Sequence, residues 1–375
     1  MKTQFVFALA LVGACSSGGA PSGDLGVPAD LSLADLTPPL PLGNNCLGTV
    51  LVENYTCSNP NDYHPRDSAP AHLVWPACVS DDNAFHLTAS TAPPSVARVA
   101  QFESVAPTLW GKATLPDPAD FTAAVTLLSA SGGIVGQLAA VEDKHYPPVP
   151  GSDSCASAAT TYPDRCAGAA KLMPTVTELV QQGKAGNLTH VQAERLEATL
   201  LWYFYLSATW ETANCDTTAS GDGNCDAQWA DSTGGQARDQ VTGLAGYVSK
   251  LGIESKDRIY DGNLAIRCWR DFTTSGNPRP DLFNFGAQQL DRALIHGLAL
   301  VARQRFTQLG CATGQYKEGH FQFLKILVGF LDRASRAGSH TAEADVLKAQ
   351  INATADTVDV TAALAALDTL YPACP

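Results

Sequence analysis

The clearest pattern of apolar positions lies in the second half of the chain, from about residue 164 onward. Apolar side chains recur there at intervals of three and four, in segments bounded by Thr, Ser, Pro and Gly. Positions three and four apart share one face of an α-helix, so this spacing predicts a series of helices. They cover residues 174–182, 189–213, 237–251, 255–271, 285–309, 315–337, 341–353 and 360–370. The short connections between them favour antiparallel packing in a bundle.

The preceding part, residues 46–162, is rich in Pro and short turns and shows one long helical pattern. This pattern spans residues 118–143 after an Asp-Pro pair that suits a helix start, and the glycine pair at 132–133 is expected to divide it. Two short apolar runs are interpreted as strands, residues 49–52 and 84–88. We therefore predict a mainly α protein: a disulfide-stapled helical bundle over residues 163–375, with an irregular, turn-rich N-terminal part.

Before residue 46 the chain lacks the pattern of a folded domain. Residues 1–14 have a short basic start and about ten apolar residues, which as a helix would rise about 15 Å, half the thickness of a bilayer's hydrocarbon core. They are predicted to be a signal peptide. Residues 15–45 consist mainly of Ser, Gly, Pro, Ala, Leu and Asp, which predicts a flexible tether. The alternative is an arm that packs on the domain through its leucines.

The cysteine count predicts an oxidised domain with one cysteine left over. The chain has 11 cysteines, and without Cys15 the number is even, as expected if every other cysteine forms a disulfide. No two of them have the Cys-x-x-Cys spacing of zinc ribbons or thioredoxin-type sites. The disulfide candidates are Cys46, Cys57, Cys78, Cys155, Cys166, Cys215, Cys225, Cys268, Cys311 and Cys374. Three pairs are close enough in sequence to close short loops: Cys46 with Cys57, Cys155 with Cys166, and Cys215 with Cys225.

Cys15 follows Val12-Gly13-Ala14, and this tetrapeptide resembles the lipobox of bacterial lipoproteins, with Val12 where Leu is commonest. The resemblance implies cleavage before Cys15, a lipid on its thiol and attachment to a membrane. Ser16, by resemblance to sorted lipoproteins, implies the outer membrane. The alternative is an ordinary thiol inside a secretory signal that is cut elsewhere.

The charge balance and the missing motifs limit the possible functions. The net charge is −13, the sequence pI is about 4.9, and Lys and Arg form no cluster, so nucleic acid is not an expected partner. The sequence contains no nucleophile elbow, His-Glu-x-x-His pair, phosphate loop or dinucleotide fingerprint. The common hydrolase, metallopeptidase and nucleotide-binding classes therefore lack support, although a triad of distant residues stays open.

Two polar residues on predicted helices are candidate metal ligands. In the helix over residues 189–213, segment 200–206 is apolar or aromatic on every side, so Glu197 is expected to be partly buried. A buried carboxylate needs a partner, either a metal or an arginine from a neighbouring helix, and the arginine is favoured. His320 lies within the apolar stripe of its helix and is expected to face inward, as a core residue or a ligand. His296 lies away from the stripe of its own helix and is expected to be solvated.

The segment from Cys215 to residue 231 is predicted to be an acidic loop. Asp222 and Asp226 echo the oxygen-ligand spacing of a calcium site, but Ala227 replaces the turn glycine of an EF-hand and the closing glutamate is missing. A looser calcium site and a solvated loop are the alternatives, and the solvated loop is favoured.

A second polar segment, residues 258–271, is dense in Arg, Asp and Trp. Cys268 is expected to form a disulfide and Trp269 to fill the core. This structural interpretation is favoured over a site for an anionic ligand at Arg267 and Arg270.

Residues 225–235, CDAQWADSTGG, and the order of helices around them are similar to secreted iron-assimilation proteins first known from green algae. The similarity covers about residues 164–374 and implies metal handling without assigning any ligand. Three functions follow from the sequence. A membrane-anchored binding or interaction lipoprotein without catalysis is favoured; the others are an iron- or calcium-binding protein and an enzyme with dispersed catalytic residues.

Overall fold

The computed structural model of the chain describes residues 59–66, 74–89, 91–146, 149, 160–162, 166, 170–216, 221–250, 255–274, 276, 279–337 and 341–371. The predicted signal peptide, the tether, the strand at 49–52 and the lipobox cysteine lie outside these residues. So do four of the disulfide candidates, Cys46, Cys57, Cys155 and Cys374.

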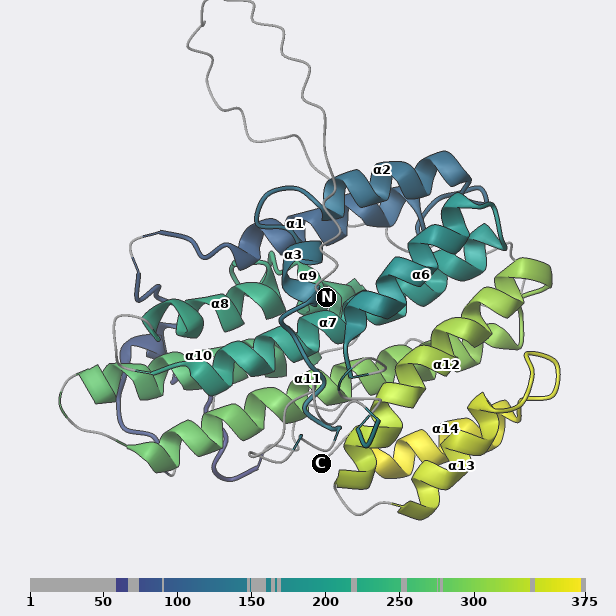
Figure 1. Cartoon of the computed structure of the whole chain (residues 1–375). Coiled ribbons are helices and arrows are strands. Elements are labelled where there is room, and N and C mark those ends of the chain that lie inside the picture. Colours follow the sequence, from purple (N-terminus) through teal and green to yellow (C-terminus); the bar gives the residue numbers. More distant parts are fainter. Residues whose placement is uncertain are drawn as a thin grey trace, which may run out of the picture. The chain divides into compact units, whose positions relative to one another are not determined.

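The predicted mainly α fold is confirmed, and the described residues form twelve α-helices and no β-strand. The helices are α1 (Ser95–Val105), α2 (Pro118–Leu128), α3 (Ile134–Leu138), α6 (Leu172–Lys184), α7 (Thr189–Asn214), α8 (Asp222–Thr233), α9 (Gly243–Lys250), α10 (Ser255–Thr274), α11 (Pro280–Leu309), α12 (Gly314–Ala337), α13 (Thr341–Ile351) and α14 (Val360–Leu370) (Figure 1). Two 3₁₀ helices, η1 (Val79–Asp82) and η2 (Ala106–Thr108), complete them. No helix in this part of the chain is both long and apolar enough to span a membrane.

All eight helices predicted in the second half are present, and the helical pattern at 118–143 divides into α2 and α3 as expected. The division falls at the glycine pair because Gly132 has a φ of 72°, a left-handed conformation that glycine adopts without steric cost. Helix α11 begins five residues before the predicted start, with Pro280 in its first turn, where the missing N–H of proline costs nothing.

Two helices were not predicted, and one predicted strand is not formed. Helix α1 was missed, and α8 occupies much of the predicted acidic loop. The predicted strand at 84–88 is irregular, because side chains take its backbone hydrogen bonds: Arg267 donates to the carbonyl of His86, and Asp226 accepts from the N–H of Thr88. A segment bonded in this way needs no partner strand.

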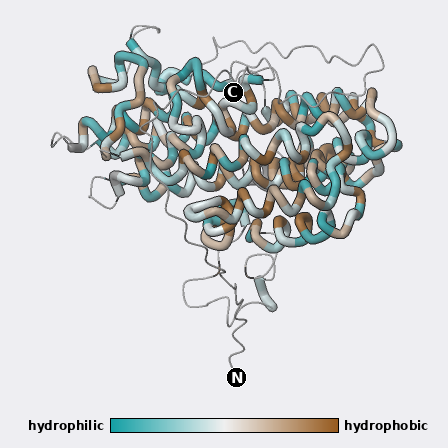
Figure 2. Tube along the Cα trace, turned by 90° about the horizontal axis from the view of Figure 1, so that it is seen from above, coloured by the Kyte–Doolittle hydropathy of each residue, from teal (hydrophilic) through white to brown (hydrophobic). Residues whose placement is uncertain are grey.

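Helix α7 is the centre of the fold. The apolar run 200–206, predicted to be surrounded, is buried throughout, and α7 contacts α6, α8, α9, α11 and α12. Helices α10 and α11 pack side by side, as do α13 and α14 (Figure 1). Brown and teal segments alternate along most helices in Figure 2, as expected for helices that bury one face.

Two disulfides join segments of the described chain. Cys215 and Cys225 are bridged, as predicted, and connect the end of α7 to α8. Cys268 of α10 forms the expected disulfide, and its partner is Cys78, 190 residues earlier in the chain. Cys166 and Cys311 are disulfide-bonded as well.

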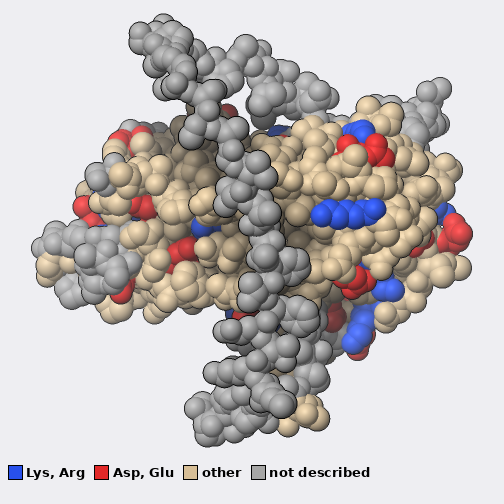
Figure 3. Space-filling view, turned by 45° about the horizontal axis from the view of Figure 1, so that its top comes forward, with Lys and Arg blue, Asp and Glu red and all other residues tan. Residues whose placement is uncertain are grey.

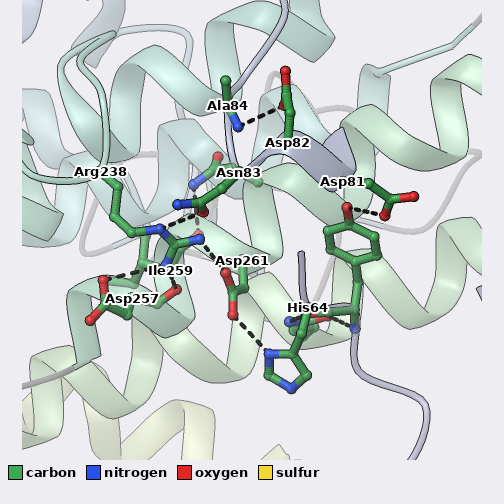
Figure 4. A network of polar contacts seen from close by, with 12 residues as sticks. His64, Asp81, Asp82, Asn83, Ala84, Arg238, Asp257, Ile259 and Asp261 are labelled. Atoms are coloured by element: carbon green, nitrogen blue, oxygen red, sulfur yellow. Dashed lines mark hydrogen bonds and ion pairs between the residues drawn. The ribbon is translucent and has the colours of Figure 1, made fainter. Parts of the chain in front are cut away.

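Besides the Cys78–Cys268 disulfide, polar contacts of residues before and after Cys78 attach this part of the chain to the helices. Arg238 pairs with Asp261 of α10, and its Nε donates to Asn83 Oδ1 at 2.8 Å (Figure 4). His64 Nδ1 lies 2.8 Å from the other Asp261 oxygen. The backbone of Tyr63 exchanges two hydrogen bonds with the side-chain amide of Gln289. The described irregular segments, residues 59–66 and 74–89, are therefore bound to α10 and α11.

Replacing both cysteines of the long-range bridge, Cys78→Ala with Cys268→Ala, is expected to lower the free energy of unfolding by about 2–4 kcal/mol. The same change at Cys215 and Cys225 is expected to cost less, because that bridge closes a loop of 10 residues instead of 190. Urea unfolding of both variants measures the difference. Equal losses would contradict the expectation that the bridge closing the longer loop stabilises the protein more.

Candidate functional site

The best candidate site is a group of polar side chains buried between four helices, which we name the Arg305 cluster. Helix α7 is enclosed on all sides, so the carboxylates in its first half point at neighbouring helices instead of water. Arg305 lies on the buried face of α11 and meets them. The cluster consists of His190, Glu194 and Glu197 on α7, Tyr247 on α9, Arg305 on α11 and His320 on α12.

The Arg305 guanidinium connects the members of this cluster. Its Nη2 lies 2.7 Å from Glu197 Oε2, and its Nη1 lies 3.2 Å from Glu194 Oε2. Nη1 also lies 3.0 Å from His320 Nδ1. The hydroxyl of Tyr247 donates to the second oxygen of Glu197 at 2.9 Å. One cation on α11 thus binds side chains of α7, α9 and α12, and charge-assisted hydrogen bonds to the carboxylates are the stronger kind.

Two carboxylates share this single guanidinium, and their acidities differ. Burial raises the pKa of Glu197 to about 8, although Arg305 opposes the shift. Burial also acts on Glu194, but there Arg305 and His320 prevail and lower the pKa to about 2. The two groups titrate as a coupled pair, so at neutral pH the cluster holds one proton on its carboxylates and one carboxylate charge against Arg305.

Both histidines of the cluster are buried. Arg305 donates to Nδ1 of His320, so this ring nitrogen acts as the acceptor. Burial lowers the pKa of His190, whose ring contacts that of Tyr316 in a tilted arrangement with 4.6 Å between the ring centroids. His320 is 1 % exposed, so its predicted inward orientation is confirmed.

The two helical residues predicted as metal ligands, Glu197 and His320, do come together, but around a guanidinium. Both oxygens of Glu197 and the Nδ1 of His320 accept hydrogen bonds from Arg305 or Tyr247. The favoured alternative, a buried glutamate paired with an arginine of a neighbouring helix, is what the structure contains. Within the described ranges, no three His, Cys, Asp or Glu side chains are grouped so that they could hold a metal ion.

The two aspartates predicted as calcium ligands both lie on helix α8. Asp222 is the first residue of α8, and its side chain lies outside the described part. Asp226 is fully buried and accepts three short hydrogen bonds from the backbone N–H groups of Thr88 and Ala89. Its carboxylate therefore fixes the irregular segment before α1, and the prediction of a solvated acidic loop is wrong here.

His296 was expected to be solvated but is 4 % exposed. Helix α11 packs against α7, α9, α10, α12 and α14, so it buries more of its circumference than one apolar stripe implies. His296 Nδ1 lies 3.4 Å from a guanidinium nitrogen of Arg258 on α10.

In segment 258–271, the structural interpretation holds for Cys268, which is bridged, and for Trp269, which packs on Phe283.

A carboxylate-oriented histidine was missed by the sequence because its parts are distant in the chain. Asp143 is fully buried; it accepts from Trp202 Nε1 at 3.1 Å, and its other oxygen lies 2.8 Å from His145 Nδ1. His145 Nε2 faces the hydroxyl of Tyr205 at 3.4 Å, and that hydroxyl donates to Asp291. These bonds attach the segment after α3 to α7 and α11. No short sequence pattern around Asp143 or His145 predicts these contacts.

Comparison with known proteins adds no relative: no family model matches the chain, and no curated protein or solved structure matches it significantly. The similarity to iron-assimilation proteins stays a prediction, and residues 225–235 that carry it form most of α8 and the turn after it.

The variant Arg305→Met is expected to lower the free energy of unfolding by about 3–5 kcal/mol, because it leaves two buried carboxylates without their cation. Adding Glu194→Gln and Glu197→Gln should restore much of this loss. The control is Arg303→Met on the same helix, which removes a surface pair with Asp368 and should cost less than about 1 kcal/mol. Urea unfolding compares them, and equal costs at 303 and 305 would contradict the assigned role.

Proposed function

We propose that this protein is an exported lipoprotein, anchored to a membrane through Cys15, whose helical body serves as a binding or interaction domain rather than as an enzyme. The anchor rests on the lipobox-like residues before Cys15. Ser16 favours the outer membrane as its destination. Residues 16–45 then act as the tether between the lipid and the folded part.

The observation that carries the proposal is the state of the cysteines. Six of the ten candidates are disulfide-bonded in the structure: Cys78, Cys166, Cys215, Cys225, Cys268 and Cys311. Disulfides of this kind persist in oxidising compartments and are rare in the bacterial cytoplasm. Cys15 is the cysteine that is left over if the other ten form disulfides with one another, which supports a separate role for it.

The interior chemistry favours a binding role over metal handling. A metal between Glu197 and His320 would take the position of the Arg305 guanidinium and would leave that cation buried without its partners. The aspartate of the predicted calcium site already binds two backbone N–H groups. The polar groups of the interior thus support the helix packing, which leaves recognition to the surface. On the face shown in Figure 3, acidic and basic side chains are scattered among larger areas of uncharged surface.

Replacing Cys15 by Ser is expected to move the protein from the membrane fraction to the soluble fraction and to abolish incorporation of labelled fatty acid, since the acylated thiol is lost. The control Ser16→Ala keeps the thiol and should stay membrane-bound and labelled. A Cys15→Ser variant that remains in the membrane fraction would show that the anchor is elsewhere.

Exposure of the soluble Cys15→Ser chain to iron, calcium and zinc, followed by desalting and elemental analysis, is expected to leave less than one metal ion per chain. Glu197→Ala and His320→Ala should lower thermal stability without changing the metal content, because their partner is Arg305. Stoichiometric metal that these variants remove would instead establish the metal-binding function.

A further inference from the structure

A second buried ion cluster lies where α1, α7 and α8 meet, and we name it the Arg98 cluster. It is separate from the Arg305 cluster and occupies the second half of α7. Its members are Ser95 and Arg98 on α1, Tyr203, Ser207 and Glu211 on α7, and Asp231 on α8. The Arg98 and Asp231 side chains are 6 % and 0 % exposed.

The two carboxylates of this cluster are not equally well paired. Asp231 has one oxygen 3.4 Å from Arg98 Nη2, and its other oxygen accepts from the Ser207 hydroxyl at 2.6 Å. Glu211 approaches the same Arg98 nitrogen only to 3.9 Å. Its buried Oε2 has no hydrogen-bond partner within the described residues. An ionised carboxylate accepts several hydrogen bonds, so the surroundings of Glu211 suit its neutral form.

Charge balance leads to the same assignment. Arg98 is the cation that both carboxylates share, and no other described Lys or Arg pairs with either. Tyr203 also faces the cluster; burial raises its pKa, so it stays neutral. If both carboxylates were ionised, the interior would carry one uncompensated negative charge, which is costly. Burial and the Asp231 charge raise the pKa of Glu211 to about 7 against the opposing effect of Arg98.

Glu211 is also the member of the cluster that can exchange a proton with water. Its side chain is 12 % exposed, whereas Asp231 is completely enclosed. The proton can therefore leave without prior unfolding of α8. The ionised Glu211 then competes with Asp231 for Arg98, the one charged side chain by which α1 enters this cluster.

We propose that Glu211 is a proton-dependent latch that holds α1 on the bundle: α1 is bound firmly while Glu211 is protonated and loosened when this residue releases its proton to solvent. Helix α1 contacts α2, α8 and α9, so loosening it frees the packing of the segment before α2. The latch responds to pH near neutrality, in the range that an exported protein meets outside the cytoplasm.

The sign of the effect follows from proton counting. The folded protein keeps a proton on Glu211 at pH values where the unfolded chain has lost it, so the stability from this residue is full below about pH 4 and falls as pH rises to about 7. Between pH 5 and 7, the folding equilibrium constant of the full chain should fall about tenfold per pH unit relative to Glu211→Gln. The glutamine keeps the size of the neutral acid and cannot ionise. Above about pH 7.5 the difference should become constant.

Urea unfolding of the full chain from pH 5 to 8.5 tests this expectation, with Glu178→Gln, an exposed glutamate of α6, as the matched control that keeps the wild-type profile. Parallel profiles of the wild type and Glu211→Gln would overturn the proposal. Hydrogen exchange on the wild type gives a test that needs no variant. After correction for intrinsic rates, amide protection of α1 should fall between pH 6 and 8 while that of α13 and α14 does not. Protection of α1 that is independent of pH would equally overturn the latch.

Discussion

The structure depends on one constraint: helix α7 is enclosed by other helices over most of its length, so its carboxylates have to find their partners inside the protein. Arg305 from α11 serves Glu194 and Glu197, and Arg98 from α1 serves Glu211 with the nearby Asp231. Each arginine reaches α7 from a different helix. The ion clusters therefore fix how α1 and α11 are placed around α7, while the apolar residues supply most of the burial free energy.

Each of the two clusters has two carboxylates and one guanidinium. The charge of the interior therefore changes with pH, because the carboxylate in excess can bind or release a proton. In the Arg305 cluster burial raises the pKa of Glu197 while Arg305 and His320 lower that of Glu194, and in the Arg98 cluster burial raises the pKa of both Glu211 and Asp231. Buried ion pairs often add little net stability compared with apolar residues of the same size. Their retention here is explained better by the specific helix arrangement that they require than by the free energy that they add.

The candidate site was only half visible in the sequence. Periodicity correctly placed Glu197 and His320 inside, and the buried-carboxylate argument correctly favoured an arginine as partner. It did not identify Arg305, which is 108 residues from Glu197. Nor did it find the Asp143–His145 pair, whose partners come from α7 and α11. One apolar stripe per helix was also the wrong assumption for α11, where several neighbours bury His296.

By itself the sequence determined eight helices of the second half, the break between α2 and α3, and the bridge between Cys215 and Cys225, because each depends on residues close together in the chain. Tertiary structure decided which distant groups meet: Cys78 with Cys268, Arg305 with Glu197, and Asp226 with the backbone at Thr88. Tertiary structure also explains why the polar segment 222–233 is the helix α8. The sequence suggests that its aspartates are solvated, but their hydrogen-bond donors come from distant parts of the chain. The spacing of residues within one segment does not predict these contacts, because they depend on how whole helices pack together.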